Sequence, residues 1–128
     1  MYKVKLSQLR DYYKQQFWGS YMSDRHLKYM DGVKKYISDA DEEVVRKIVN
    51  YCGIALQSKD ASLVSCSDPA ELDRVRVGFC TKKLELSASD ADAAIAATCE
   101  AMKGDRQKSR VAFYYLVAEK SGTLSKLV

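Results

Sequence analysis

The chain has 128 residues, 47% of them hydrophobic and 30% charged, with a formal net charge of +4. This length and composition are typical of one globular domain that buries its own core. One proline and six glycines are too few for a turn-rich sandwich or barrel, so the composition favours helices.

Residues 1–21 form a separate basic and aromatic segment. They carry four basic residues and one acidic residue, a net of +3, which leaves 17 basic and 16 acidic residues in the rest, a net of +1. A body this close to neutral argues against nucleic acid as a partner. Apolar residues recur at helical spacing from Leu6 to Phe17. Met22 begins a segment that reads like the natural start of a protein. Two alternatives remain open: a native extension that contacts the body or a partner, or a non-native or wrongly assigned start before a single domain, 22–128.

Two helices are expected next. Ser23 or Asp24 caps a helix that ends near Ile37, and the acidic residues that follow Asp41 suit the start of a second helix, which ends near Leu56. The connection that follows is polar. Its short apolar pair, 63–64, predicts a single helical turn.

Asp68 and Pro69 give the clearest helix start in the chain. Asp68 is a good N-cap, Pro69 suits the first helical position, and Glu71 completes a capping-box arrangement. The predicted α-helix ends near Lys83, where Lys82 and Lys83 complement the negative end of the helix dipole.

Two further helices are predicted over residues 90–103, with an alanine-rich face, and over residues 106–120. The second contains the apolar run Val111–Ala118, which is too short to cross a bilayer and too continuous for a helix with one wet face. It predicts the centre of a compact all-α domain of five or six helices with a buried C-terminal helix. The small residues of the 90–103 helix suit close packing against it.

The four cysteines, Cys52, Cys66, Cys80 and Cys99, show no metal-ligand spacing, because none lies within four residues of another. Since the only histidine is His26, we expect no metal site and no cofactor. Reduced core thiols of a cytoplasmic protein are the simplest interpretation.

Several short motifs occur together in one order: Asp60-Ala61-Ser62, Ser67-Asp68-Pro69-Ala70-Glu71-Leu72, Phe79, Lys82-Lys83-Leu84, Leu86 and Phe113-Tyr114-Tyr115-Leu116. On these motifs, over about residues 24–120, the chain resembles the bacterial family numbered 2853 among the domains of unknown function. The resemblance implies a small multihelical domain with no assigned activity. Glu85 stands where we expect a glycine. The family-like residues without an assigned role are Asp68, Pro69, Glu71, Lys82, Lys83, Tyr114 and Tyr115.

The basic loop 103–110 is the candidate binding site. Lys103, Arg106, Lys108 and Arg110 crowd the expected start of the final helix, where the dipole disfavours cations. Backbone donors together with cations suit a phosphate, a nucleotide or an acidic segment. The alternative is a solvated loop with Asp105 as the helix cap.

The sequence contains no phosphate-binding loop and no nucleophile elbow, and we assign no catalytic residue. The leading hypothesis is a cytoplasmic, non-catalytic protein-interaction or regulatory module whose partner and oligomeric state are open. The alternative is a small anion- or nucleotide-binding protein, or an enzyme, that uses the basic loop.

Overall fold

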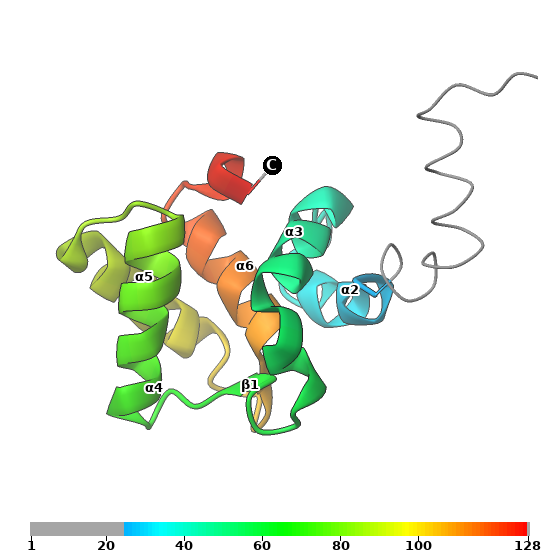
Figure 1. The fold of residues 1–128 in the computed structure, drawn as a ribbon, viewed down its shortest axis with the longest axis horizontal. Helices are drawn as coiled ribbons and strands as arrows, with labels where there is room; N and C mark the ends of the chain where they lie inside the picture. Colours follow the sequence, from blue (N-terminus) through cyan, green and yellow to red (C-terminus); the bar gives the residue numbers. More distant parts are fainter. Residues whose placement is uncertain (1–24, 128) are drawn as a thin grey trace, which may run out of the picture.

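The helix α6 (Arg110–Lys120) lies at the centre of the fold in the computed structural model, which describes residues 25–127 (Figure 1). Residues Arg110–Ala118 of this helix are all buried. A helix that is buried all round needs neighbours on every side, and helices before and after it in the fold supply them. The prediction of a mostly helical domain around a buried C-terminal helix is confirmed.

Helices α2 (Leu27–Lys34) and α3 (Glu42–Cys52) cover one side of α6. The carboxylate of Asp41 accepts a hydrogen bond of 2.9 Å from the backbone N–H of Glu43 and caps α3. The helix does not continue as α to Leu56. Gly53 has φ +53°, a conformation that ends an α-helix, and the chain goes on as the 3₁₀ helix η2 (Gly53–Gln57).

The predicted helix at 68–83 consists of α4 (Pro69–Arg74) followed by a π-helix, η3 (Val75–Lys83). The carboxylate of Asp68 accepts a 3.0 Å hydrogen bond from the N–H of Ala70, so the cap and the proline position are confirmed. The expected continuous α-helix is wrong beyond Arg74. β-Branched Val75 and Val77 and the mid-helix Gly78 weaken the α conformation there.

Helix α5 (Ala88–Ala101) packs against α6, and Ala91 and Ala94 are among its buried residues. This contact confirms the prediction that a small-residue face meets the final helix. The start differs by two residues, because Ser87 is the N-cap and its hydroxyl accepts a 3.2 Å hydrogen bond from the N–H of Asp90.

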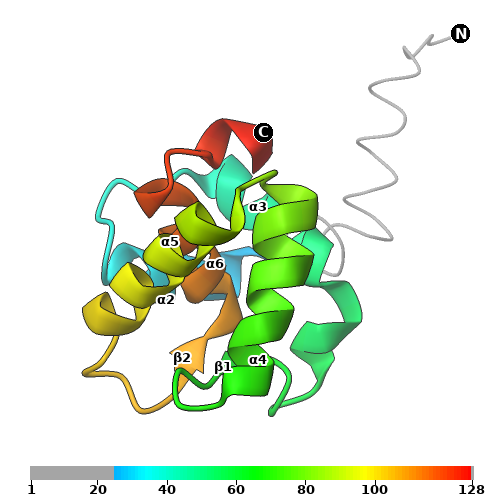
Figure 2. The same cartoon turned by 90° about the vertical axis from the view of Figure 1, so that its left-hand side faces the viewer.

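A two-stranded antiparallel pair replaces two expected helical segments (Figure 2). Strand β1 (Leu63–Val64) pairs with β2 (Lys108–Ser109), with Leu63 opposite Ser109. The helical turn at 63–64 and the start of the final helix at Arg106 are therefore wrong. A two-residue apolar run cannot distinguish a strand from a helical turn without knowledge of its partner. The last element of the described residues is η4 (Leu124–Leu127), whose Leu127 is buried.

Within residues 25–127, none of the helices combines the length and the apolar content that a bilayer crossing requires.

Glu85 adopts φ 59° in the turn between η3 and α5, the position where a glycine was expected. A left-handed conformation costs a residue with a Cβ about 1–2 kcal/mol. Glycine avoids this cost, but the greater entropy of its unfolded state offsets part of the gain in stability. We predict that Glu85→Gly raises the free energy of unfolding by about 0.5–1 kcal/mol in urea denaturation. Glu85→Ala is the control, because it also removes the exposed ion pair with Lys126 but keeps the Cβ. Equal stabilities of the two variants would contradict this explanation.

Candidate functional site

Arg110 anchors the segment before α4 to the central helix. Its Nε donates to the carbonyl of Ala61 at 2.6 Å, and a terminal nitrogen donates to the carbonyl of Leu63 at 3.2 Å. The guanidinium also forms an ion pair with Glu71 and donates to the Tyr114 hydroxyl at 3.0 Å. Only 9% of Arg110 is exposed, so this cation stabilises the fold and does not face a solvent ligand.

Glu71 serves two arginines. Besides Arg110, its carboxylate accepts a 2.7 Å hydrogen bond from exposed Arg74. The capping-box role predicted for Glu71 is wrong, because the N–H of Asp68 donates to the carbonyl of Ser65. The buried cation recruits the carboxylate because an unpaired buried charge is costly.

The two family-like tyrosines are both buried. The Tyr114 ring stacks on Phe79 with centroids 4.0 Å apart and an interplanar angle of 14°. Burial raises the pKa of Tyr114 to about 12, against the opposing effect of Arg110. The hydroxyl of Tyr115 accepts a 2.8 Å hydrogen bond from the N–H of Asp41. Both side chains therefore position helices.

A disulfide joins Cys66, in the loop before α4, to Cys99 on α5. The prediction of four reduced core thiols is wrong for this pair. The two residues are far apart in the sequence, and only the packing of the loop on α5 brings them together. Cys52 and Cys80 are free, and burial raises the pKa of their thiols to about 12 and about 11. No group of three metal-ligating side chains occurs among residues 25–127.

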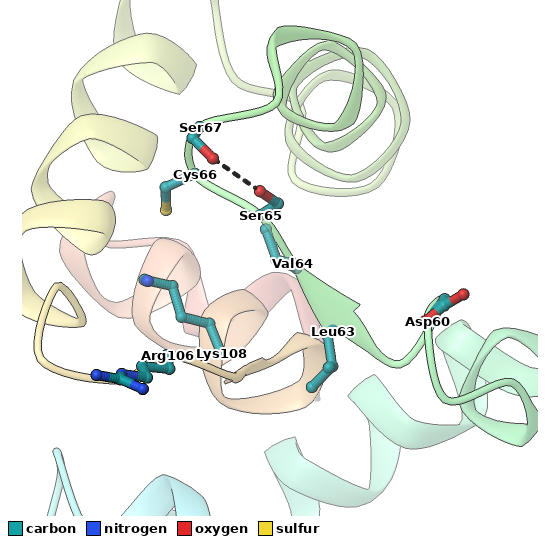
Figure 3. A pocket seen from close by; sticks show the side chains of 8 residues that line it. All are labelled: Asp60, Leu63, Val64, Ser65, Cys66, Ser67, Arg106 and Lys108. Atoms are coloured by element: carbon teal, nitrogen blue, oxygen red, sulfur yellow. Dashed lines mark hydrogen bonds between the residues drawn. The ribbon is translucent and has the colours of Figure 1, made fainter.

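A pocket of about 550 Å³ opens beside β1 and the disulfide. Figure 3 shows the Lys108 side chain extended toward the sulfur of Cys66, with the guanidinium of Arg106 beyond the Lys108 amine and farther from that sulfur. The hydroxyls of Ser65 and Ser67 are hydrogen bonded at 3.1 Å on the facing wall. The eight lining residues are Asp60, Leu63, Val64, Ser65, Cys66, Ser67, Arg106 and Lys108.

Of the four cations proposed as an anion site, the structure brings two together. Arg106 and Lys108 line the pocket, Lys103 donates to Glu100 at 2.7 Å at the end of α5, and Arg110 is buried. Because α6 begins at Arg110, its N-terminal dipole is not at Arg106. The two cations among the family-like residues, Lys82 and Lys83, are exposed at the end of η3.

Asp105 does not cap the final helix, because Ser109 occupies that position. Its carboxylate accepts a 2.7 Å hydrogen bond from Lys35 and another from the Tyr36 hydroxyl. These bonds lower the pKa of Asp105, while burial and the Asp105 carboxylate raise the pKa of Tyr36 to about 12. Asp105 is therefore engaged on the α2 side and forms no ion pair with either pocket cation, while the charge of Lys108 contributes to the lowered pKa of its carboxylate.

The pocket keeps an excess of positive charge. Lys108 donates to the carbonyl of Asp105 at 2.8 Å, and neither Arg106 nor Lys108 forms an ion pair with a carboxylate of residues 25–127. Asp60 is the one acidic lining residue, and its carboxylate points away from the two cations in Figure 3. Two cations opposite two hydroxyls can hold a small anion by charge-assisted hydrogen bonds.

These features define a small helical domain with a cationic pocket. The chain belongs to the family described as Protein of unknown function (DUF2853), whose model matches residues 28–125. The family assignment confirms the resemblance and brings no activity with it. A search of curated proteins finds no match to the chain.

We predict that Arg110→Met lowers the free energy of unfolding by about 3–5 kcal/mol, because it leaves the buried Glu71 carboxylate without its buried partner. Arg74→Met is the matched control. It removes the other arginine of the same carboxylate, but Arg74 is exposed, so the expected loss is at most about 1 kcal/mol. Chemical denaturation of both variants checks the difference. Equal losses would show that burial does not distinguish the two pairs.

Proposed function

We propose that this domain is a binding module that holds a small anion in the pocket of Arg106, Lys108, Ser65 and Ser67. The observation that carries the proposal is the pair of cations at one pocket, neither of them in an ion pair with a carboxylate of the described residues. Such a pair attracts anions because cations in a concave site focus their field on it.

The size and walls of the pocket favour a small molecule. A volume of about 550 Å³ lies in the range of metabolite sites. Leu63, Val64 and Cys66 add an apolar wall, so an organic phosphate, sulfate or carboxylate fits the pocket better than a bare ion. The hydroxyls of Ser65 and Ser67 supply neutral donors for additional oxygens.

His26 and the two free thiols lie outside the set of residues that line this pocket, so they supply no acid–base or nucleophilic group to it. His26 is buried, and its Nε2 lies 2.9 Å from the Glu42 carboxylate at the α2–α3 contact, away from the lining residues. The thiols of Cys52 and Cys80 remain protonated at neutral pH because burial raises their pKa.

We predict that inorganic phosphate stabilises the full chain in thermal unfolding, and that the double variant Arg106→Ala with Lys108→Ala loses this stabilisation. At 100 times its dissociation constant a ligand adds about 2.7 kcal/mol, which shifts the unfolding midpoint of a domain of this size by several degrees. The shift is expected to shrink as sodium chloride is added, because salt screens the cations.

Lys103→Ala is the control for this experiment. It removes a cation of the same loop that pairs with Glu100 and does not line the pocket, so the phosphate shift should persist. The proposed site would be overturned if the shift survived in the double variant, or if no anion shifted the unfolding midpoint of the full chain.

A second candidate function is protein interaction, favoured by exposed apolar residues at the end of α3, in η2 and in η3. Ile54 is 81% exposed and Val77 is 53% exposed. Tyr51 links them, since it precedes Ile54 by one helical turn and its hydroxyl donates to the carbonyl of Gly78 at 3.3 Å. Exposed apolar side chains gathered in this way are typical of contact surfaces, and π-helices are often found at functional sites.

A second copy of the chain is the first partner to test at this surface. Sedimentation velocity of the full chain over a range of concentrations should show self-association, and Ile54→Ser with Val77→Ser should weaken it without loss of helix content. Leu27→Ser, at an exposed apolar residue of α2, is the matched control. A chain that stays monomeric would contradict self-association through this surface.

A bacterial source and a cytoplasmic location complete the proposal. The two free thiols are compatible with a reducing compartment. In such a compartment a disulfide is usually transient and chemically active.

A further inference from the structure

The disulfide forms part of the wall of the cationic pocket. Cys66 lines the pocket together with Arg106 and Lys108, and in Figure 3 the extended Lys108 amine points toward its sulfur. Cys66 and Cys99 are both half-buried, so a small reagent can approach them, whereas Cys80 is buried.

A second pocket, of about 450 Å³, lies on the other side of the bond. Cys66 and Cys99 both line it, together with Arg76, Asp92 and Glu100. Its ionisable lining residues are one cation and two carboxylates, while those of the first pocket are two cations and one carboxylate. Asp92 pairs with Arg76 at 3.2 Å and Glu100 pairs with Lys103 at 2.7 Å, so cations balance the carboxylates of the second pocket. An anionic reagent is therefore attracted to Cys66 from the first pocket and finds no such attraction on the Cys99 side.

We propose that Cys66 is a thiol–disulfide exchange site, and that its substrates are small thiols carrying carboxylates, which bind at Arg106 and Lys108. This inference rests on the proposed anion pocket and names its ligand class. The thiol-specific element is the Cys66–Cys99 bond, which an ordinary anion site would not need.

The exchange balances as follows. The thiolate of the small thiol attacks Cys66 Sγ, a new S–S bond forms there, and the Cys66–Cys99 bond breaks. Cys99 leaves with the electron pair and takes a proton from water. A second thiolate attacks the sulfur of the bound small thiol, and Cys66 leaves as a thiolate. Two small thiols are oxidised to their disulfide, and the protein disulfide is reduced by two electrons.

The same positions define the reverse reaction. The thiolate of reduced Cys66, near the ammonium of Lys108, attacks one sulfur of a small anionic disulfide. The S–S bond of that disulfide breaks, one small thiol leaves as a thiolate, and the same mixed disulfide forms. Cys99 then attacks Cys66 Sγ, closes the protein disulfide and releases the second small thiol. Cys66 is thus the sulfur that carries the small molecule in both directions, and Cys99 is the resolving sulfur.

The first test compares thiols of different charge. The rate constant for opening the disulfide of the full chain, per thiolate, is measured at low salt with glutathione (anionic), 2-mercaptoethanol (neutral) and cysteamine (cationic). We expect glutathione to react at least about tenfold faster than cysteamine, the lower end of electrostatic rate effects. Arg106→Ala with Lys108→Ala should abolish the preference, and Lys103→Ala should keep it. Rates that do not follow thiol charge would overturn the inference.

The second test locates the intermediate. Oxidised glutathione is added to Cys99→Ser and to Cys66→Ser after circular dichroism has confirmed that each is folded, and peptide mass spectrometry finds the modified cysteine. Fast modification of Cys66 in Cys99→Ser, with slow modification of Cys99 in Cys66→Ser, supports the inference. Equal or reversed rates overturn it.

Phosphate binding, measured on the same samples by thermal unfolding, separates this inference from the proposed function. A phosphate shift without charge preference among thiols leaves the anion site standing and removes the exchange chemistry. The absence of both removes both.

Discussion

The guanidinium of Arg110 is the constraint on which most of this structure depends. It occupies the first turn of the central helix and directs its donors to two loop carbonyls, a carboxylate and a phenol. A cation buried this deeply is tolerated only when its donors are satisfied. The loop whose carbonyls accept these hydrogen bonds is therefore held in a fixed position. That position determines the β1–β2 pairing, the start of α6 and the location of Cys66.

The anchor explains why neighbouring cations have different roles. Arg110 directly follows β2 and is buried, whereas Lys108, two residues earlier, lines the pocket beside β1. Glu71 pairs with Arg110, and Asp105 pairs with Lys35 and accepts a hydrogen bond from Tyr36, so neither carboxylate forms an ion pair with Arg106 or Lys108. The positive charge of the pocket is thus a result of how the neighbouring charges pair.

Local patterns were sufficient to predict most of the helices. The cap at Asp68 and the apolar run in α6 each report an environment that depends on nearby residues. The early end of α3 at Gly53 and the π-helix η3 have local causes, whereas the errors at the site share one physical cause, since each involves a partner distant in sequence. Strand β1 exists because residues 108–109 lie beside it, the disulfide because a loop packs on α5, and the role of Glu71 because Arg110 is buried. Of the four cations named from charge alone, Arg106 and Lys108 line the pocket. Ser65, Ser67 and Cys66 carried no sequence signal that would place them opposite those cations.

The central helix is also made after most of the segments that pack on it. Helices α2 to α5 are synthesised before α6, and each presents an apolar face whose partner has not yet left the ribosome. Domains generally fold as units once their residues have emerged. We therefore expect the α2–α5 segment to remain uncollapsed or chaperone-bound until α6 has emerged from the ribosome, so that core formation follows the synthesis of the central helix.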